Sequence, residues 1–202
     1  MKILLTAFEP FGGRTRNASA EAMTALLHQS GVLPDVSLEG CLLPVEMGRA
    51  SEELRQALDS VQPDVLLAMG EAKRDAICLE QIGVNERHYT IPDNAGNLIE
   101  NQPIDPTGPP SYTATLPLDN MLIAMQTSGV PVRLSDDAGR YLCNEVLYVG
   151  LAYAQHHSRP GRVGFIHVPH LPSAAGSAED YPSLPTEDVV RALQAALRVL
   201  TS

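Results

Sequence analysis

The sequence predicts an α/β fold, a three-layer α/β/α sandwich built around a mostly parallel twisted sheet. Short apolar runs typical of buried parallel strands recur along the chain, and the clearest of them lies at residues 65–69. Amphipathic stretches separate these runs, as at residues 49–61, where Leu54, Leu58 and Val61 share one helical face. This alternation of strands and helices is typical of a parallel sheet that helices cover on both faces.

The predicted elements follow one another in a regular order. The first strand is an apolar run at residues 3–7, which Glu9 and Pro10 end too early for a signal peptide. The other predicted strands lie at residues 37–45, 65–69, 130–134 and 163–168. The predicted helices lie at residues 19–29, 49–61, 120–127 and 144–156, and a last helix begins with Thr186 as its N-cap. No internal repeat or change in composition marks a boundary, so we predict a single domain over residues 1–202.

One segment, residues 91–117, interrupts this alternation. It contains six prolines and two glycines, which exclude a regular helix or an inner strand. Loops of this length inside a compact domain are usually functional or disordered. The alternative is a surface arm that packs between subunits.

Composition excludes several classes of partner. The chain has 14 Lys and Arg against 24 Asp and Glu, a net charge of -10, which argues against nucleic acid or an anionic membrane as the main partner. No apolar run is long enough for a membrane span. Three widely spaced cysteines without a C-x-x-C pair disfavour both a disulfide framework and a zinc site. We therefore expect a cytoplasmic protein without a metal.

Cys143 is the candidate nucleophile. It follows a polar loop and precedes a helical pattern, so it lies at or just before a helix N-terminus. Exposed backbone N–H groups at such a position favour a thiolate and could hold a developing oxyanion. An inert buried cysteine is the more frequent alternative. For Cys41 and Cys78, which lie in apolar stretches, the inert alternative stands.

A thiol nucleophile needs a base and a group that orients the base. His167 is a polar residue at the end of an apolar strand, and strand ends are where α/β sheets build their sites. A hydrogen-bonded structural histidine explains the pattern equally well, and His170 is a second candidate base. Glu80 lies among apolar neighbours, so it needs a partner if it is buried. The alternative for Glu80 is a position that faces the surface.

An aromatic pair, Phe8 and Phe11, lies on one turn after the first strand, although the chain has only three Phe. The pair could form flat walls around a small planar ligand, or a hydrophobic plug under the sheet. Gly12 and Gly13 lack the spacing of a phosphate-binding loop.

Four motifs together identify a family. They are Phe-Glu-Pro-Phe-Gly-Gly at residues 8–13, Ile-Pro-Asp-Asn-Ala-Gly at 91–96, Cys-Asn at 143–144 and Gly-Phe-Ile-His-Val-Pro at 164–169. With these motifs in this order, the chain resembles the pyroglutamyl peptidase I (pyrrolidone-carboxylate peptidase) family over nearly its whole length. The resemblance implies a cytoplasmic cysteine peptidase with an α/β/α fold that removes an N-terminal pyroglutamate. It also implies a homo-oligomer, often a tetramer, that needs neither a metal nor an organic cofactor.

The resemblance also assigns roles to residues. Matched by motif, the family's catalytic residues fall on Glu80, Cys143 and His167. Its aromatic substrate pocket falls on Phe8, Phe11 and Tyr141, with Asn17 nearby. In the implied mechanism the cysteine thiolate attacks the carbonyl that follows the lactam ring, the histidine moves the proton, and the glutamate orients the histidine.

The chain departs from the family pattern at several positions, among them Tyr141, where members often have Phe before the nucleophile. It has Thr90 where members commonly carry Arg, and Glu-Ala-Lys-Arg at residues 71–74 where members often have Gly-Gly-Arg. Two other functions therefore stay open: a catalytically silent relative that binds a small lactam-like ligand, and a cysteine hydrolase that acts on another small amide. Alkylation of Cys143 and a panel of amides would separate them.

Overall fold

A six-stranded sheet forms the centre of the computed structural model, which describes residues 1–29, 35–172 and 181–201. The strand order is β2-β1-β3-β8-β4-β7. The strands are β1 (Lys2–Phe8), β2 (Ser37–Leu43), β3 (Val65–Glu71), β4 (Ile77–Glu80), β7 (Val132–Ser135) and β8 (Arg162–Val168). All neighbouring strands run parallel except β4 and β8. The mostly parallel sheet is confirmed, and the antiparallel pair becomes important for the site.

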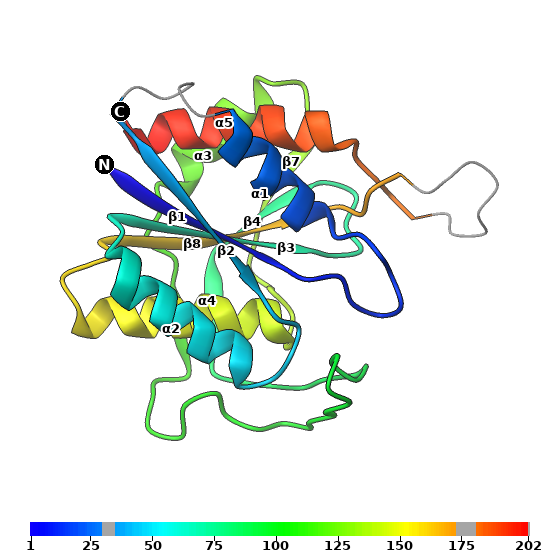
Figure 1. Cartoon of the computed structure of the whole chain (residues 1–202), viewed down its shortest axis with the longest axis vertical. Helices are drawn as coiled ribbons and strands as arrows, with labels where there is room; N and C mark the ends of the chain where they lie inside the picture. Colours follow the sequence, from blue (N-terminus) through cyan, green and yellow to red (C-terminus); the bar gives the residue numbers. More distant parts are fainter. Residues whose placement is uncertain (30–34, 173–180, 202) are drawn as a thin grey trace.

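Helices cover both faces of this sheet (Figure 1). They are α1 (Ala18–His28), α2 (Arg49–Val61), α3 (Leu118–Gln126), α4 (Leu142–His156) and α5 (Thr186–Thr201). Helices α1, α3 and α5 lie on one face, and α2 and α4 lie on the other. The predicted three-layer architecture is confirmed.

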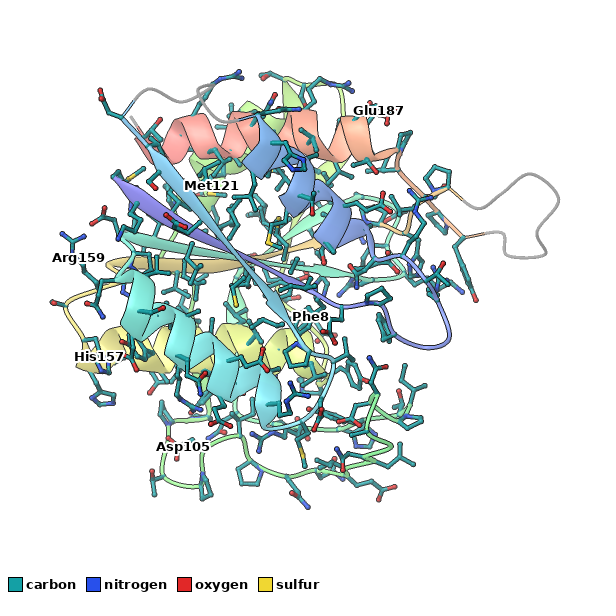
Figure 2. All side chains as sticks on the ribbon, viewed as in Figure 1. Phe8, Asp105, Met121, His157, Arg159 and Glu187 are labelled. Carbon is teal, nitrogen blue, oxygen red and sulfur yellow. The ribbon has the colours of Figure 1, made fainter. Side chains whose placement is uncertain are left out.

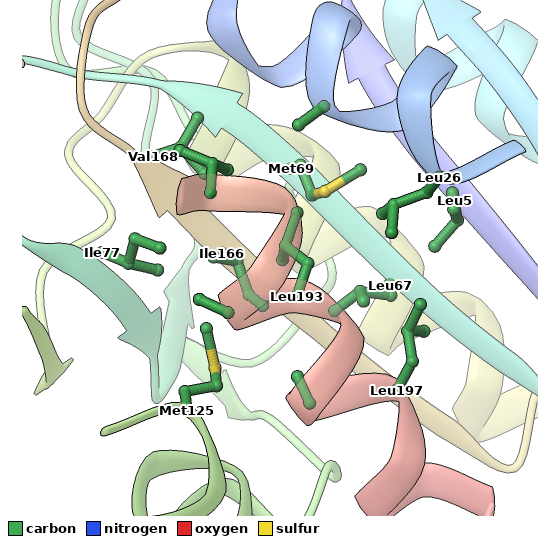
Figure 3. Packing of buried hydrophobic residues seen from close by; sticks show 14 of the residues in the cluster. Leu5, Leu26, Leu67, Met69, Ile77, Met125, Ile166, Val168, Leu193 and Leu197 are labelled. Carbon is green, nitrogen blue, oxygen red and sulfur yellow. The ribbon is translucent and has the colours of Figure 1, made fainter. Parts of the chain in front are cut away.

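Each face has its own hydrophobic core. Figure 3 shows the core under α5, where Leu193 and Leu197 pack on Leu67 and Ile166 of the sheet. Leu193 and Leu197 are four residues apart and therefore share one face of α5. Burying a leucine side chain fully stabilises the fold by about 1.5–3 kcal/mol. Acidic residues in the first turn of α5 and Arg198 in its last turn complement the helix dipole.

The predicted helices and strands are present, and their ends differ by a few residues. Helix α3 begins at Leu118 rather than at residue 120, and Thr186 is the first residue of α5 rather than its cap. The sequence analysis did not assign a small antiparallel pair, β5 (Ile82–Val84) with β6 (Ser111–Thr113). Strands of three residues are too short to show an alternating pattern. In the part of the chain that the structure describes, no helix is long and apolar enough to cross a bilayer.

Residues 85–110, called the arm below, run along the outer side of α2 and α4 (Figure 1). Side chains of α4 hold the arm in place. The Arg87 guanidinium donates to both carboxylate oxygens of Glu145, at 2.7 and 2.9 Å. The Asn144 amide donates to the backbone carbonyls of Val84, the last residue of β5, and of Glu86 in the arm, and the Tyr148 hydroxyl donates to the carbonyl of Pro109. Side chains of α4 thus satisfy backbone groups of the arm outside the regular strands.

Candidate active site

Cys143 is the second residue of α4, as the sequence analysis expected. Its thiol rests on Gly70 at the carboxyl end of β3. A Cβ atom added to Gly70 would lie 2.7 Å from Cys143 Sγ, closer than a side chain tolerates, so this strand position has room only for hydrogen. The thiol is therefore placed where the N-terminus of α4 meets the edge of the sheet, and the first N–H groups of a helix have no partner within the helix.

His167 lies beside this thiol. It is directly opposite Gly70 in the parallel pairing of β3 with β8, and it is 3% exposed. His167 Nδ1 lies 2.7 Å from Glu80 Oε1. Because an ionised carboxylate only accepts hydrogen bonds, Nδ1 carries a proton, and Nε2 is left for the hydrogen bond with Cys143.

Charge decides the protonation of this histidine. Burial lowers the pKa of His167, but the negative charge of the Cys143 thiolate and hydrogen bonds to Cys143 and Glu80 outweigh burial and raise the pKa to about 9. The arrangement therefore favours a protonated His167 imidazole at neutral pH.

Glu80 reaches His167 through the antiparallel pairing of β4 with β8. In this register Cys78 is opposite His167, and Glu80 is opposite Phe165, so Glu80 is the diagonal neighbour of His167 on the same face. Glu80 is fully buried, and the expectation that it has a partner is confirmed. A second charge lies close, because the Arg74 guanidinium is 3.8 Å from Glu80 Oε1. Within the described residues, Glu80 Oε2 has no hydrogen-bond partner.

A cavity of about 320 Å³ opens in front of Cys143. All four residues predicted for the substrate pocket line it: Phe8, Phe11, Asn17 and Tyr141. Phe8, labelled in Figure 2, lies at the carboxyl end of β1 and is 4% exposed. The Phe8 ring belongs to the core under α2 and α4 and also lines the cavity. Phe8 therefore fits both alternatives of the sequence analysis, the hydrophobic plug under the sheet and the wall of a ligand pocket.

Aromatic rings form one wall of the cavity. The centroid of the Tyr141 ring lies 6.2 Å from that of Phe11, which also lines the cavity, and 4.6 Å from that of Tyr89, which is buried and supports Tyr141. The Tyr141 hydroxyl donates to the backbone carbonyl of Pro92 in the arm, at 3.3 Å. Asn17 is the N-cap of α1, and its side chain accepts from Ser19 N at 3.0 Å. The wall is therefore assembled from the loop after β1, the arm and the start of α4.

Sequence reasoning placed only some of the lining residues. Val45, Glu71, Arg74, Thr90 and Ile91 also line the cavity. The family pattern had drawn attention to Thr90, to the segment 71–74 and to the motif that begins at Ile91, but none of these residues was assigned to the substrate pocket. Val45 lies in the loop after β2, and the family pattern did not point to it.

The other candidate residues, Cys41, Cys78 and His170, are not among those that line the cavity. Burial raises the pKa of Cys41, and the negative charge of Glu53 adds to this effect. Burial also raises the pKa of Cys78, against the opposing charges of nearby arginines. His170, the second candidate base, pairs with Glu71 rather than with Cys143. Among residues 1–29, 35–172 and 181–201, no cluster of three or more His, Cys, Asp or Glu could hold a metal ion.

The arrangement has the parts that acyl transfer by a thiol requires. A thiol at a helix N-terminus adjoins an imidazole, a buried carboxylate fixes the tautomer of the imidazole, and an apolar cavity with a few polar groups lies in front.

Comparisons with known proteins also indicate a peptidase. The model of a family described as pyroglutamyl peptidase matches residues 1–202. Pyrrolidone-carboxylate peptidase of Vibrio vulnificus (strain CMCP6) is 42% identical over 196 residues, which are 96% of this chain and 89% of the relative. The protein of the same name from Pyrococcus furiosus is 37% identical over 205 residues, covering 98% and 97% of the two chains. A crystal structure of pyrrolidone carboxyl peptidase from P. furiosus superposes with a TM-score of 0.92 at 36% identity, covering 98% of this chain and 97% of that one.

Proposed function

Since the chain belongs to the pyroglutamyl peptidase family, we propose that it is a cysteine exopeptidase that removes an N-terminal pyroglutamyl residue from peptides. One observation supports the assignment of residues most directly. The Cys143 thiol lies over Gly70 beside His167, and His167 is held from its other side by the buried carboxylate of Glu80.

The proposed reaction has two stages. The Cys143 thiolate attacks the carbonyl carbon that follows the lactam ring, and backbone N–H groups at the start of α4 hold the oxyanion. His167 then gives its Nε2 proton to the leaving amine, which departs as the shortened peptide. In the second stage neutral His167 takes a proton from water, the water oxygen attacks the thioester, and pyroglutamic acid leaves as the thiolate and the imidazolium form again. Glu80 keeps the proton on Nδ1 throughout and stabilises the imidazolium.

The cavity suits this substrate. Pyroglutamate is a flat, neutral lactam without a free amine, so it needs apolar walls and a few hydrogen-bonding groups. Phe8, Phe11 and Tyr141 supply the walls. Replacing Phe11 by Ala removes part of one wall, so we expect KM for pyroglutamyl amides to rise while alkylation of Cys143 stays nearly unchanged. An unchanged KM would show that Phe11 does not contribute to substrate binding.

The central test is release of a chromophore from a pyroglutamyl amide, with alanyl and glutaminyl amides of the same chromophore as comparison substrates. We expect the wild type to cleave only the pyroglutamyl amide, Cys143→Ser to abolish release, and the matched control Cys41→Ser to retain it. Release by Cys143→Ser would contradict the assigned nucleophile. Binding of a lactam without cleavage would favour the silent relative, and cleavage of another amide would favour a different cysteine hydrolase.

Three further predictions belong to this proposal. We expect residues 1–202 to fold as one domain, the protein to be cytoplasmic, and the chain to assemble as a homo-oligomer, as the family resemblance implies. Sedimentation equilibrium tests the assembly, since a tetramer and a monomer differ fourfold in mass.

A further inference from the structure

A second buried pair of an acid and a histidine lies next to the cavity, and the proposed mechanism does not use it. Glu71 Oε1 lies 2.7 Å from His170 Nδ1, and the side chain of Glu71 is only 2% exposed. Glu71 is one of the residues that line the cavity, and it directly follows Gly70, on which the thiol rests. Glu71 thus borders the cavity without taking part in the proposed reaction.

Three neighbours hold this carboxylate. His170 donates to Oε1, and the backbone N–H of Ala18, the first residue of α1, donates to Oε2 at 2.6 Å. The Arg14 guanidinium lies 3.5 Å from Oε1. Arg14 also lies 3.2 Å from His170 Nδ1, but that nitrogen cannot accept while it donates to the carboxylate at the shorter distance. Arg14 therefore acts on Glu71 through its charge.

These contacts turn the carboxylate away from the reacting atoms. Successive residues of a strand point to opposite faces of the sheet. The Cys143 thiol covers Gly70 on the α4 side, whereas the next side chain, Glu71, reaches the start of α1. Among the described residues, Arg74 and His167 also line the cavity, and both carry positive charge. With the Glu71 carboxylate directed towards α1, no other described residue of the lining offers a carboxylate to a cation.

We propose that Arg14 and His170 determine specificity by holding the Glu71 carboxylate towards α1, so that it cannot pair with the N-terminal ammonium of a substrate. This inference rests on the proposed function, because it concerns which N-terminal residue reaches Cys143. The nitrogen of the lactam is neutral and needs no counter-ion. The corresponding nitrogen of an N-terminal proline carries a charge, and it lies two bonds from the carbon that the thiolate attacks. Burying that charge unpaired is unfavourable.

The test compares kcat/KM for pyroglutamyl and prolyl amides of one chromophore, measured on the same preparation of each variant. The ratio of the two values cancels any loss of folded protein. In Arg14→Gln/His170→Phe, where phenylalanine keeps a ring at position 170, the released carboxylate can pair with the prolyl ammonium. We expect the ratio to fall about ten- to a hundredfold, the range for a charge-assisted contact that is partly exposed. Where prolyl turnover is too slow, the inhibition constant of prolinamide replaces it.

Two further variants separate the carboxylate from a loosened pocket. Adding Glu71→Gln to the double variant removes the charge and should restore the ratio. Arg16→Gln is the matched control, because it removes the same charge two residues from Arg14, where Arg16 pairs with Glu21 instead. Its ratio should equal that of the wild type.

An unchanged ratio in the double variant would overturn the inference, and so would a lowered ratio that Glu71→Gln does not restore. If the wild type itself failed to cleave the pyroglutamyl amide, the proposed function would be wrong, and the inference that rests on it would be wrong as well. That outcome is read from the wild type alone, so the two failures are distinguishable.

Discussion

Gly70 offers a direct test of how the nucleophile is placed. In Gly70→Ala the new Cβ would lie 2.7 Å from Cys143 Sγ and 2.9 Å from Phe165 Cζ. Carbon atoms in contact prefer separations of about 3.5–4.0 Å, and sulfur is larger, so the thiol must move by about 1 Å or the strand must shift. A displacement of this size at a reacting atom lowers the rate about a hundredfold. Overpacking costs a further about 1–3 kcal/mol of stability.

The assay measures kcat/KM on a pyroglutamyl amide, the rate of Cys143 alkylation and the urea midpoint of each variant. We expect activity to fall about a hundredfold in Gly70→Ala protein that is still folded at the assay temperature. Because Phe165 also meets the new methyl group, Gly70→Ala/Phe165→Leu relieves that contact and leaves the contact with the thiol. The double variant should recover stability more than activity.

The matched control is Gly161→Ala. A Cβ at Gly161 meets only the backbone oxygen of Asp64 at 3.9 Å, an ordinary contact, so activity and stability should stay near those of the wild type. Full activity in folded Gly70→Ala would refute the reasoning, because the thiol would then have no fixed position over the strand.

Other predictions test the remaining members of the proposed trio. Iodoacetamide at neutral pH should label Cys143 before Cys41 and Cys78, whose pKa values burial raises, and mass spectrometry of the peptides would show equal labelling if this assignment is wrong. Glu80→Gln should lower kcat by about one to three decades while the fold is retained. If this variant turned over substrate as fast as the wild type, Glu80 would have a structural role only. The pKa of His167 is raised from 6.5 to about 9, because Cys143 and Glu80 outweigh the effect of burial, so the bound proton stabilises the fold fully below pH 6.5 and this stabilisation is lost as the pH rises towards 9. Urea unfolding of the wild type and of His167→Gln should therefore diverge in pH dependence over this interval, and parallel curves would contradict the shift.

The sequence predicted those parts of the structure that local patterns encode. Apolar runs such as residues 65–69 identify the buried strands, and amphipathic spacing identifies α2. Cys143 and His167 stood out for a similar reason, because each is a reactive side chain at the end of a regular element. The two residues then meet because parallel strands and the helices between them bring such ends to one edge of the sheet.

The partners of these residues could not be read from local patterns. Glu80 meets His167 only because β4 enters the sheet antiparallel to β8. The order and direction of strands in a sheet cannot be predicted from the sequence of any single segment. The pairing of Glu71 with His170 likewise joins the end of β3 to the loop after β8. Both contacts depend on tertiary structure alone.

The two pairs have a similar construction on opposite faces of the sheet. Each joins a glutamate near the end of a strand to a histidine at or just after the end of β8, and each faces a helix N-terminus. What differs is the group that the helix presents. Helix α4 presents a thiol, so the imidazole of His167 has a proton to exchange. Helix α1 presents the backbone N–H of Ala18 to Glu71, so among the described contacts the Glu71–His170 pair has no nucleophile to activate.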